Sequence, residues 1–434
     1  MNYKLSIFWF RRDLRLNDNH GFYQSLSQSE SVLPIFIFDT NILSKLHEED
    51  RRVSLLFDRL KSLNAELRKI GKKIHIFYGD PVRVFDEISQ KSSIQALFTN
   101  TDYEPYATKR DKSVKNKLST KNIKFHTYKD QLIFEKNEIL TDSNKFYSVY
   151  TPYMKKWKSK FKISMTEPYP SETLLHKCIV DNSLRSVETL TEMGFKHTSY
   201  QLPQPKLDYR TLVEYDTQRN NPESDGTSHI SVHLRFGFTS IREAVNAAYQ
   251  YSDSFLKELI WRSFFTQVLW HNPSVVDSCF RQKYENIEWI KDSALFRKWK
   301  YGETGFALVD AGMRQLFDTG YMHGRVRMLT ASFLVKNMGM DWRLGEAYFA
   351  SMLLDYDLAS NNGNWQWVAG TGCDSSPYFR VFNPEIQRKK FDPNFNYCKK
   401  WISDFRDDGH YPASKILDLK SSVAKSISRY KKCQ

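Results

Sequence analysis

The periodicity of apolar residues changes once along this chain, and the change constrains the fold more than any other feature. Over the first 130 residues, short apolar runs typical of buried strands alternate with segments of helical periodicity. From residue 207 onward the periodicity is almost entirely helical. Strands that alternate with helices form a parallel sheet with helices on both faces. We therefore predict a Rossmann-like α/β domain followed by an all-α domain.

The apolar runs also give the boundaries of the expected elements. The five expected strands span residues 4–10, 31–38, 74–78, 94–99 and 123–128. The clearest expected helices span residues 51–70, 254–269, 307–319 and 324–338. The first strand is not followed by the GxGxxG that marks dinucleotide-binding sheets. We expect an α/β domain at 1–130, a connector at 131–202 and a helical domain at 203–434.

Charge and composition narrow the classes of partner. The net charge of +14 and the pI near 9.3 favour a polyanion such as nucleic acid. No apolar run reaches the roughly 20 residues that a membrane helix needs. The five cysteines form no CxxC pair, which argues against a disulfide framework and a metal site and fits a reducing cytoplasm. Aromatic residues are 15% of the chain, and some can stack on planar ligands.

The segment DYDLASNNGNWQW at 355–367 is the strongest candidate for a functional site. It brings two acids, consecutive asparagines and two tryptophans together within thirteen residues. Any one of these residues is more simply explained as part of a turn or of the core. Polar side chains that face a pocket need a ligand to satisfy them, however. The combination therefore predicts a bound cofactor.

This segment resembles the flavin-binding core of the photolyase/cryptochrome family, closest to the class I cyclobutane pyrimidine dimer photolyases. So do GETGFALVDAGMRQL (302–316), GYMHGRVRMLTASFLVK (320–336) and GTGCDSSPYFRVFNP (370–384). FWFRRDLRLNDN (8–19) is similar to the opening of the same family. The resemblance implies an antenna-type N-terminal domain, FAD bound in the helical domain, and electron transfer from photoexcited reduced FAD that splits the dimer. A lesion that reaches a buried flavin must be flipped out of the duplex.

The resemblance assigns roles to individual residues. It places at the flavin Tyr215, Thr227, Ser228, His229, Ile230, Ser231, Phe255, Arg262, Arg327, Asp355, Asp357 and Asn361. At the lesion it places Glu258, Trp261, Met328 and Trp367, with Asn361 serving the flavin N5. It assigns the electron relay to Trp365, Trp342 and Trp289. It assigns DNA contacts to Arg219, Arg262, Arg325 and Arg380. No residue is assigned to a metal.

Three positions depart from the family pattern. Gly324 stands where these photolyases usually carry an asparagine that helps to hold the lesion. Phe255 replaces a tryptophan, and Ser263 replaces a glutamate. Tyr106 and Ala107 stand where folate-binding relatives carry Asn-Glu, which disfavours a folate antenna. A deazaflavin antenna, a second flavin or no antenna all stay open.

The leading hypothesis is a monomeric, cytoplasmic enzyme that repairs UV-damaged DNA. A cryptochrome that senses blue light with the same FAD and tryptophans is the alternative. The chain ends about fifty residues after 384, which leaves little room for a long signalling extension. A (6-4) photolyase is disfavoured because histidines would stand at Gly324 and Met328. A basic nucleic-acid-binding protein without light chemistry is the third hypothesis.

Overall fold

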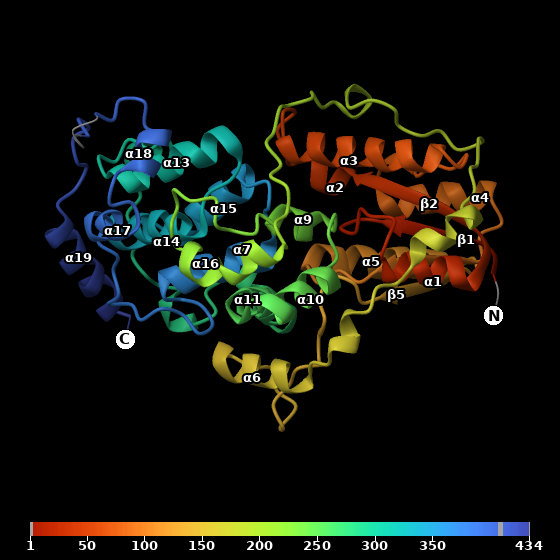
Figure 1. Cartoon of the computed structure of the whole chain (residues 1–434), viewed down its shortest axis with the longest axis horizontal. Helices are drawn as coiled ribbons and strands as arrows, with labels where there is room; N and C mark the ends of the chain where they lie inside the picture. Colours follow the sequence, from red (N-terminus) through yellow and green to blue (C-terminus); the bar gives the residue numbers. More distant parts are fainter. Residues whose placement is uncertain (1–2, 407–410, 434) are drawn as a thin grey trace. The chain divides into compact units, whose positions relative to one another are not determined.

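A computed structural model describes residues 3–406 and 411–433, and the chain forms two compact units (Figure 1). The first unit holds the residues up to Glu135 together with Lys160–Pro205 and Ile230–Ala247. The second holds Lys136–Ser159, Lys206–His229 and the chain from Ala248 onward. Each unit is therefore built from segments distant in sequence. The domain boundaries after residues 130 and 202 follow chain order instead, and they stay a prediction.

The first unit is built on a parallel sheet of five strands in the order β3-β2-β1-β4-β5. The strands are β1 (Tyr3–Phe10), β2 (Ser29–Asp39), β3 (His75–Gly79), β4 (Ala96–Asn100) and β5 (Lys124–Tyr128). Its main helices are α1 (His20–Gln28), α2 (Thr40–Leu43), α3 (Arg51–Arg68), α4 (Pro81–Lys91), α5 (Pro105–Ser119), α9 (Ser231–Phe236) and the start of α10 (Ile241–Tyr251). All five predicted strands are present, with the most buried strands, β1, β2 and β4, inside the sheet and β3 and β5 at its edges.

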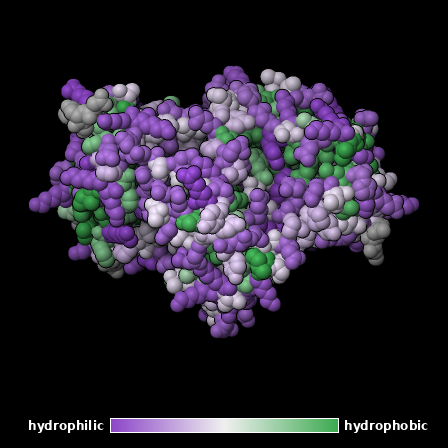
Figure 2. Space-filling model, in the orientation of Figure 1, coloured by the Kyte–Doolittle hydropathy of each residue, from purple (hydrophilic) through white to green (hydrophobic). Residues whose placement is uncertain are grey.

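Both faces of this sheet are covered, as the alternation of apolar side chains requires. Phe8 and Phe10 of β1 pack into a core with α1 and α3. Ile7 and Trp9, which point the opposite way, pack with α4 and α5. Side chains alternate between the faces of a strand, so one strand serves both cores. The polar surface of Figure 2 is interrupted by only small apolar patches on the face that it shows.

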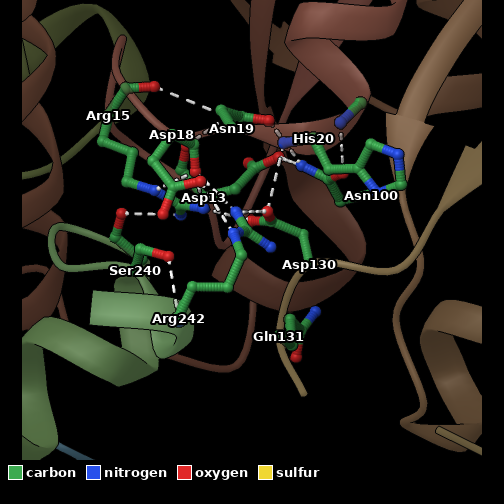
Figure 3. Close-up of polar contacts among 12 residues, drawn as sticks. Asp13, Arg15, Asp18, Asn19, His20, Asn100, Asp130, Gln131, Ser240 and Arg242 are labelled. Atoms are coloured by element: carbon green, nitrogen blue, oxygen red, sulfur yellow. Dashed lines mark hydrogen bonds and ion pairs between the residues drawn. The ribbon is translucent and has the colours of Figure 1, made fainter. Parts of the chain in front are cut away.

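A buried ionic network fixes the loop after β1 within this unit (Figure 3). Arg15 donates to Asp130 at 2.6 Å, and Arg242 at the start of α10 donates to Asp18 and Asp130 at 2.7 Å. These four side chains are 8% exposed or less. Asn100 donates to the carboxylate of Asp13, whose pKa is raised by its burial. The charged residues of the 8–19 motif are thus satisfied internally and serve the fold.

Helices make up almost all of the second unit. They are α6 (Tyr150–Lys160), α7 (Tyr209–Val213), α8 (Tyr215–Gln218), α11 (Asp253–His271), α12 (Ser293–Lys300), α13 (Ala307–Thr319), α14 (Gly324–Ser332), η6 (Phe333–Asn337), α15 (Trp342–Met352), α16 (Leu358–Ala369), α17 (Pro384–Phe391), α18 (Asn396–Trp401) and α19 (Leu419–Lys431). Short 3-10 turns connect several of them. The predicted helix at 324–338 is α-helical only to Ser332, and η6 continues it as a π-helical turn.

One large core holds this unit together. It joins α13, α14, η6, α15 and α16 and includes three buried tryptophans, Trp299, Trp342 and Trp365. In the described ranges, no helix is both long and apolar enough to cross a membrane. The five cysteines are free, and four of them are buried.

Candidate functional site

Helix α11 presents the two residues predicted to meet a lesion. Ser252 caps the helix by accepting a hydrogen bond from the backbone of Phe255. Glu258 and Trp261 lie one turn apart and are both half-buried, so they share one face of the helix. Phe255 is buried and packs edge-on against Tyr215, with 5.2 Å between ring centroids. This brings two of the predicted flavin residues into direct contact.

The carboxylate of Glu258 already has a partner. Arg219, which follows α8, donates to it and forms an ion pair. Burial alone would lower the pKa of Arg219, but the Glu258 carboxylate outweighs this effect and raises it. The same guanidinium lies 5.5 Å from the centroid of the Tyr215 ring. The sequence assigned both charged residues to DNA and gave no sign that they pair with each other.

Helix α16 carries Trp367 and approaches α11 closely. A Cβ at Gly363 would lie 2.2 Å from the ring of Phe265 on α11, so only glycine permits this contact. Phe265 in turn lies against Trp261, with 5.4 Å between centroids. Trp367 is half-buried, one turn after Gly363. The Gly363–Phe265 contact therefore sets the spacing between the helices that carry the two predicted wall tryptophans.

Asn361 on α16 is held by a half-buried glutamate, Glu346, that sequence reasoning missed. Its Nδ2 donates to the carboxylate of Glu346 at 2.8 Å and to the Glu346 backbone oxygen at 3.1 Å. Burial raises the pKa of Glu346 above its usual value. No described residue donates to Oδ1 of Asn361, so this oxygen is the part of the amide that can accept from a flavin.

A buried ion pair lies at the start of the same segment. Arg327 of α14 donates through both terminal nitrogens to the two oxygens of Asp355, at 3.1 and 2.9 Å. Its Nε donates to the backbone oxygen of Met322 at 2.7 Å. Asp357 caps α16 by accepting from the backbone of Ser360. The structure thus pairs two residues that the resemblance places at the flavin.

The turn from Asp225 to His229 is held by charges. Asp225 pairs with Lys206 and with His229. His229 has a φ of +50°, unusual for a residue with a side chain, and its Nδ1 is buried without a partner in the described chain. Ser228 is buried and Thr227 is half-buried. Ile230 and Ser231 fall in the first unit, at the N-terminal end of α9, and their place at the flavin stays a prediction.

Several polar side chains of α16 do not need a ligand, contrary to the argument from sequence. Asn362 and Gln366 donate to the backbone oxygen of Val275, both at 3.0 Å. Asn364 donates to the backbone of Ser360. These amides fasten the helix to the loop after α11. The cofactor argument therefore rests on Asn361 and the Arg327–Asp355 pair rather than on the whole segment.

The three predicted relay tryptophans belong to one core. Trp365 and Trp342 are buried and Trp289 packs against the same cluster. A Cβ at Gly345 would lie 2.2 Å from the Trp365 ring, so α15 lies directly on this side chain. Trp365 also contacts Trp299, at 6.2 Å between centroids, a tryptophan that the sequence did not single out. Among the described residues, no two of the three predicted rings make a direct ring contact.

The remaining predicted arginines lie at different depths. Arg325 pairs with Asn220, and its Nη1 lies 3.7 Å from the Met328 sulfur. Its pKa is lowered by burial and then by Arg219 and Arg380, so these three cations are neighbours. Arg380 is exposed, while Arg262 on α11 is half-buried. At Gly324, an added Cβ would meet no atom within 4 Å.

These residues fit a flavin. The Thr227 and Ser228 turn offers hydroxyls for a diphosphate, and Arg327 with Asp355 offers a fixed donor and acceptor pair. His323 caps α14 through Nδ1, burial lowers its pKa to about 4, and its Nε2 has no partner among the described residues. Buried polar atoms without protein partners are rare and call for a ligand or water.

Comparison with known proteins agrees with this chemistry. Residues 6–173 match a family model described as DNA photolyase, and residues 255–432 match the FAD binding domain of DNA photolyase. A deoxyribodipyrimidine photo-lyase from Synechococcus is 36% identical, over 92% of this chain and 88% of that protein. This chain belongs to the DNA photolyase family.

Two solved photolyases share the whole architecture. A bacterial class III photolyase from Agrobacterium tumefaciens is 27% identical, with a TM-score of 0.86 over 100% of this chain and 98% of that one. An archaeal photolyase from Sulfolobus tokodaii, described with two FAD molecules, is 34% identical, with a TM-score of 0.79 over 99% and 100% of the two chains. The predicted α/β plus all-α fold is confirmed.

Proposed function

We propose that this photolyase repairs cyclobutane pyrimidine dimers in DNA by light-driven electron transfer. The observation that carries the proposal is the face of α11, where Glu258 and Trp261 lie together beside Arg219. That face and its neighbour combine an acceptor, an aromatic plane and a cation, which are the groups that recognise flipped-out bases. FAD, when bound, supplies the electron on absorbing light. The protein supplies position and electrostatics.

The flavin is held, in this proposal, by residues of the second unit. Thr227, Ser228 and His229 hold the diphosphate, and Tyr215 and Phe255 line the pocket. Arg327 and Asp355 fix the polar edge of the ring system, with Asp357 nearby. The Oδ1 of Asn361 would accept a hydrogen bond from a protonated flavin nitrogen, and the bond from its Nδ2 to Glu346 holds the amide in that orientation. Arg262 of the second unit completes the proposed set, while Ile230 and Ser231 belong to the first unit and are assigned to the flavin by the resemblance alone.

The lesion contacts Glu258, Trp261, Trp367 and Met328. Arg219 donates to Oε1 of Glu258, so opening of this pair would free the second carboxylate oxygen for the lesion as well. A DNA phosphate can compete with a carboxylate for a guanidinium, because phosphates and carboxylates can each accept two parallel hydrogen bonds from it. Binding of the DNA backbone by Arg219 would thus release Glu258 for the lesion.

Electrons reach oxidised flavin through Trp365, Trp342 and Trp289 in this proposal. Support comes from their membership of one apolar core, where a charge passing between rings is shielded from water. Trp299 contacts Trp365 but is fully buried, so it offers no exit to solvent. Trp289→Phe should slow flavin photoreduction and spare repair by enzyme reduced beforehand.

Arg219, Arg262, Arg325 and Arg380 would neutralise DNA phosphates. A protein that neutralises Z phosphates of duplex DNA shows a salt slope near −0.9Z. Burial, and then the charges of Arg219 and Arg380, lower the pKa of Arg325, and a phosphate beside it would stabilise its cationic form.

Two further properties belong to this proposal. We infer that a second chromophore, if one binds, is a flavin or deazaflavin rather than a folate. The Tyr106 hydroxyl donates to Asp39 at 2.6 Å, and a flavin is compatible with the two FAD molecules of the archaeal photolyase.

The free cysteines fit a reducing cytoplasm. We expect a monomer near 51.3 kDa by light scattering.

The test is an absorption spectrum of the purified protein, followed by repair of dimer-containing DNA under blue light. Bound FAD and light-dependent loss of dimers are expected. A protein without flavin would overturn the proposal. Bound FAD without repair would favour the photoreceptor, and preferential repair of a (6-4) lesion would show that the inference from Gly324 and Met328 is wrong.

A further inference from the structure

Tyr150, at the start of α6, stacks face to face on Trp261. The ring centroids are 3.6 Å apart and the planes differ by 7°. Tyr150 is buried, whereas Trp261 is half-buried. One flat face of the Trp261 indole is therefore covered by another aromatic ring, and the rest of the indole carries its exposed surface.

Three further contacts fix Tyr150 in this position. Its hydroxyl donates to the backbone oxygen of Lys257 at 2.9 Å. Its backbone N–H donates to the carboxylate of Asp374 at 3.0 Å. Phe264 packs edge-on against both Tyr150 and Trp261, at 5.9 and 5.5 Å. The thiol of Cys373 donates to the backbone oxygen of Ser148. The loop before α17, which holds Cys373 and Asp374, therefore anchors the chain at both Ser148 and Tyr150.

The contact to Lys257 reaches the backbone of Trp261 itself. In an α-helix the oxygen of residue i accepts from the N–H of residue i+4. The oxygen of Lys257 is thus the acceptor for the N–H of Trp261 and also for the Tyr150 hydroxyl. Tyr150 therefore constrains Trp261 at two points, through the indole plane and through the helical turn below it.

We propose that Tyr150 is a positioning residue that fixes the plane of Trp261 before a lesion binds. The inference rests on the proposed function, because Trp261 is the predicted lesion wall. A half-exposed indole on a helix can occupy several rotamers. Ordering it on binding costs free energy, and a ring already held in place avoids that cost. The stack selects one orientation and leaves the opposite face for a base.

Two substitutions separate the stack from simple space filling. Tyr150→Phe keeps the ring and loses the hydroxyl, and it should bind dimer-containing DNA within about twofold of wild type. Tyr150→Leu keeps an apolar side chain but removes the stack, and it should weaken dimer binding roughly three- to tenfold. Neither change removes a charge, so affinity for undamaged DNA should stay the same.

The experiment uses FAD-loaded protein and measures binding of matched oligonucleotides with and without a dimer. The proposal is supported if Tyr150→Phe binds the dimer oligonucleotide like wild type and Tyr150→Leu binds it more weakly, with no loss of affinity for the undamaged oligonucleotide. Equal affinities for all three proteins, or an equal loss on both oligonucleotides, overturn it. In a Trp261→Leu background, Tyr150→Leu should add no further loss, and an additive loss also overturns the proposal.

Two controls keep the outcome decisive. If Tyr150→Leu loses FAD, Asp374→Gly removes the acceptor of the Tyr150 N–H at a residue whose φ of +47° suits glycine. It should weaken dimer binding roughly three- to tenfold, because one hydrogen bond to a charged acceptor is lost; a change within about twofold would contradict the proposal. If wild type repairs no dimers, the proposed function is wrong. If wild type repairs dimers but the Tyr150 variants bind the dimer like wild type, only this inference is wrong.

Discussion

Two arginine–carboxylate pairs in the second unit have the same chemistry but different surroundings. The side chains of Arg327 and Arg219 are similarly exposed, with 26% and 28% of their surface accessible. Their carboxylates differ, since Asp355 is 4% exposed and Glu258 is 40% exposed. The difference between the two pairs therefore lies with the acid.

A buried carboxylate cannot leave its partner cheaply, because it would lose its counter-charge without gaining water. A half-exposed carboxylate exchanges a protein partner for water at little cost. The Arg327–Asp355 pair is therefore suited to a fixed contact with a cofactor. Arg219–Glu258 is suited to a contact that opens when a substrate arrives.

The largest effect is expected from breaking the buried pair. Asp355→Asn keeps the shape of the side chain but leaves Arg327 without a counter-charge, which should cost about 2–4 kcal/mol of unfolding free energy. Retention of FAD should fall with it. Urea unfolding and the ratio of flavin to protein absorbance measure the two effects. Asp404→Asn is the control, since Asp404 pairs with Arg314 at the surface and should cost under about 1 kcal/mol.

Breaking the half-exposed pair should spare the fold and impair function. Glu258→Gln should change the unfolding free energy by less than about 1 kcal/mol. Its affinity for dimer DNA should fall roughly tenfold, since a hydrogen bond to a charged group is worth about 1.5–3 kcal/mol. Arg219→Gln should instead weaken binding to all DNA and reduce the salt slope by about 0.9. A large loss of stability in either variant would show that this pair, too, is structural.

Glu346 differs from both acids because it is half-buried beside an amide rather than a cation. Its pKa is raised from the usual 4.5, so the folded state binds its proton more tightly than the unfolded state. The stabilisation from that proton is complete below pH 4.5 and is lost as pH rises through the folded-state pKa. Relative to Glu346→Gln, wild type should lose about 1.4 kcal/mol per pH unit across that interval. Urea unfolding of both proteins from pH 4 to 8 tests this, and a constant difference would contradict it.

The smallest effect is expected at Gly324, near the exposed pair. An asparagine there meets no clash, because an added Cβ has no atom within 4 Å. Gly324→Asn should leave stability within about 0.5 kcal/mol and tighten dimer binding no more than a few-fold. Competition binding against wild type measures the change. Weaker binding would mean that this chain holds lesions differently from its relatives.

Much of the fold follows from the sequence, because periodicity reports which faces are buried. The strands of the sheet and the helices α11 and α13 were predicted within a few residues for this reason. Contacts between residues far apart left no such signal. Arg219 with Glu258, Asn361 with Glu346 and Tyr150 with Trp261 became visible only once packing brought their helices together.

The α16 segment shows where the argument from sequence expects a ligand that some residues do not need. The sequence argument expects the polar side chains of this segment to need a ligand, but the backbone of Val275 satisfies both Asn362 and Gln366. Sequence identifies a polar side chain without revealing whether the partner is protein or cofactor. Family resemblance supplied the roles of Asn361 and Trp365, and the geometry supplied their neighbours.

The most direct test of the central claim compares dimer-containing and undamaged oligonucleotides bound to wild type and Glu258→Gln, with equal FAD content. The account predicts that wild type prefers the dimer, and that Glu258→Gln loses about tenfold of this preference while binding undamaged DNA as before. An unchanged preference, or an equal loss on both oligonucleotides, would contradict the claim that the exposed carboxylate is kept for the lesion.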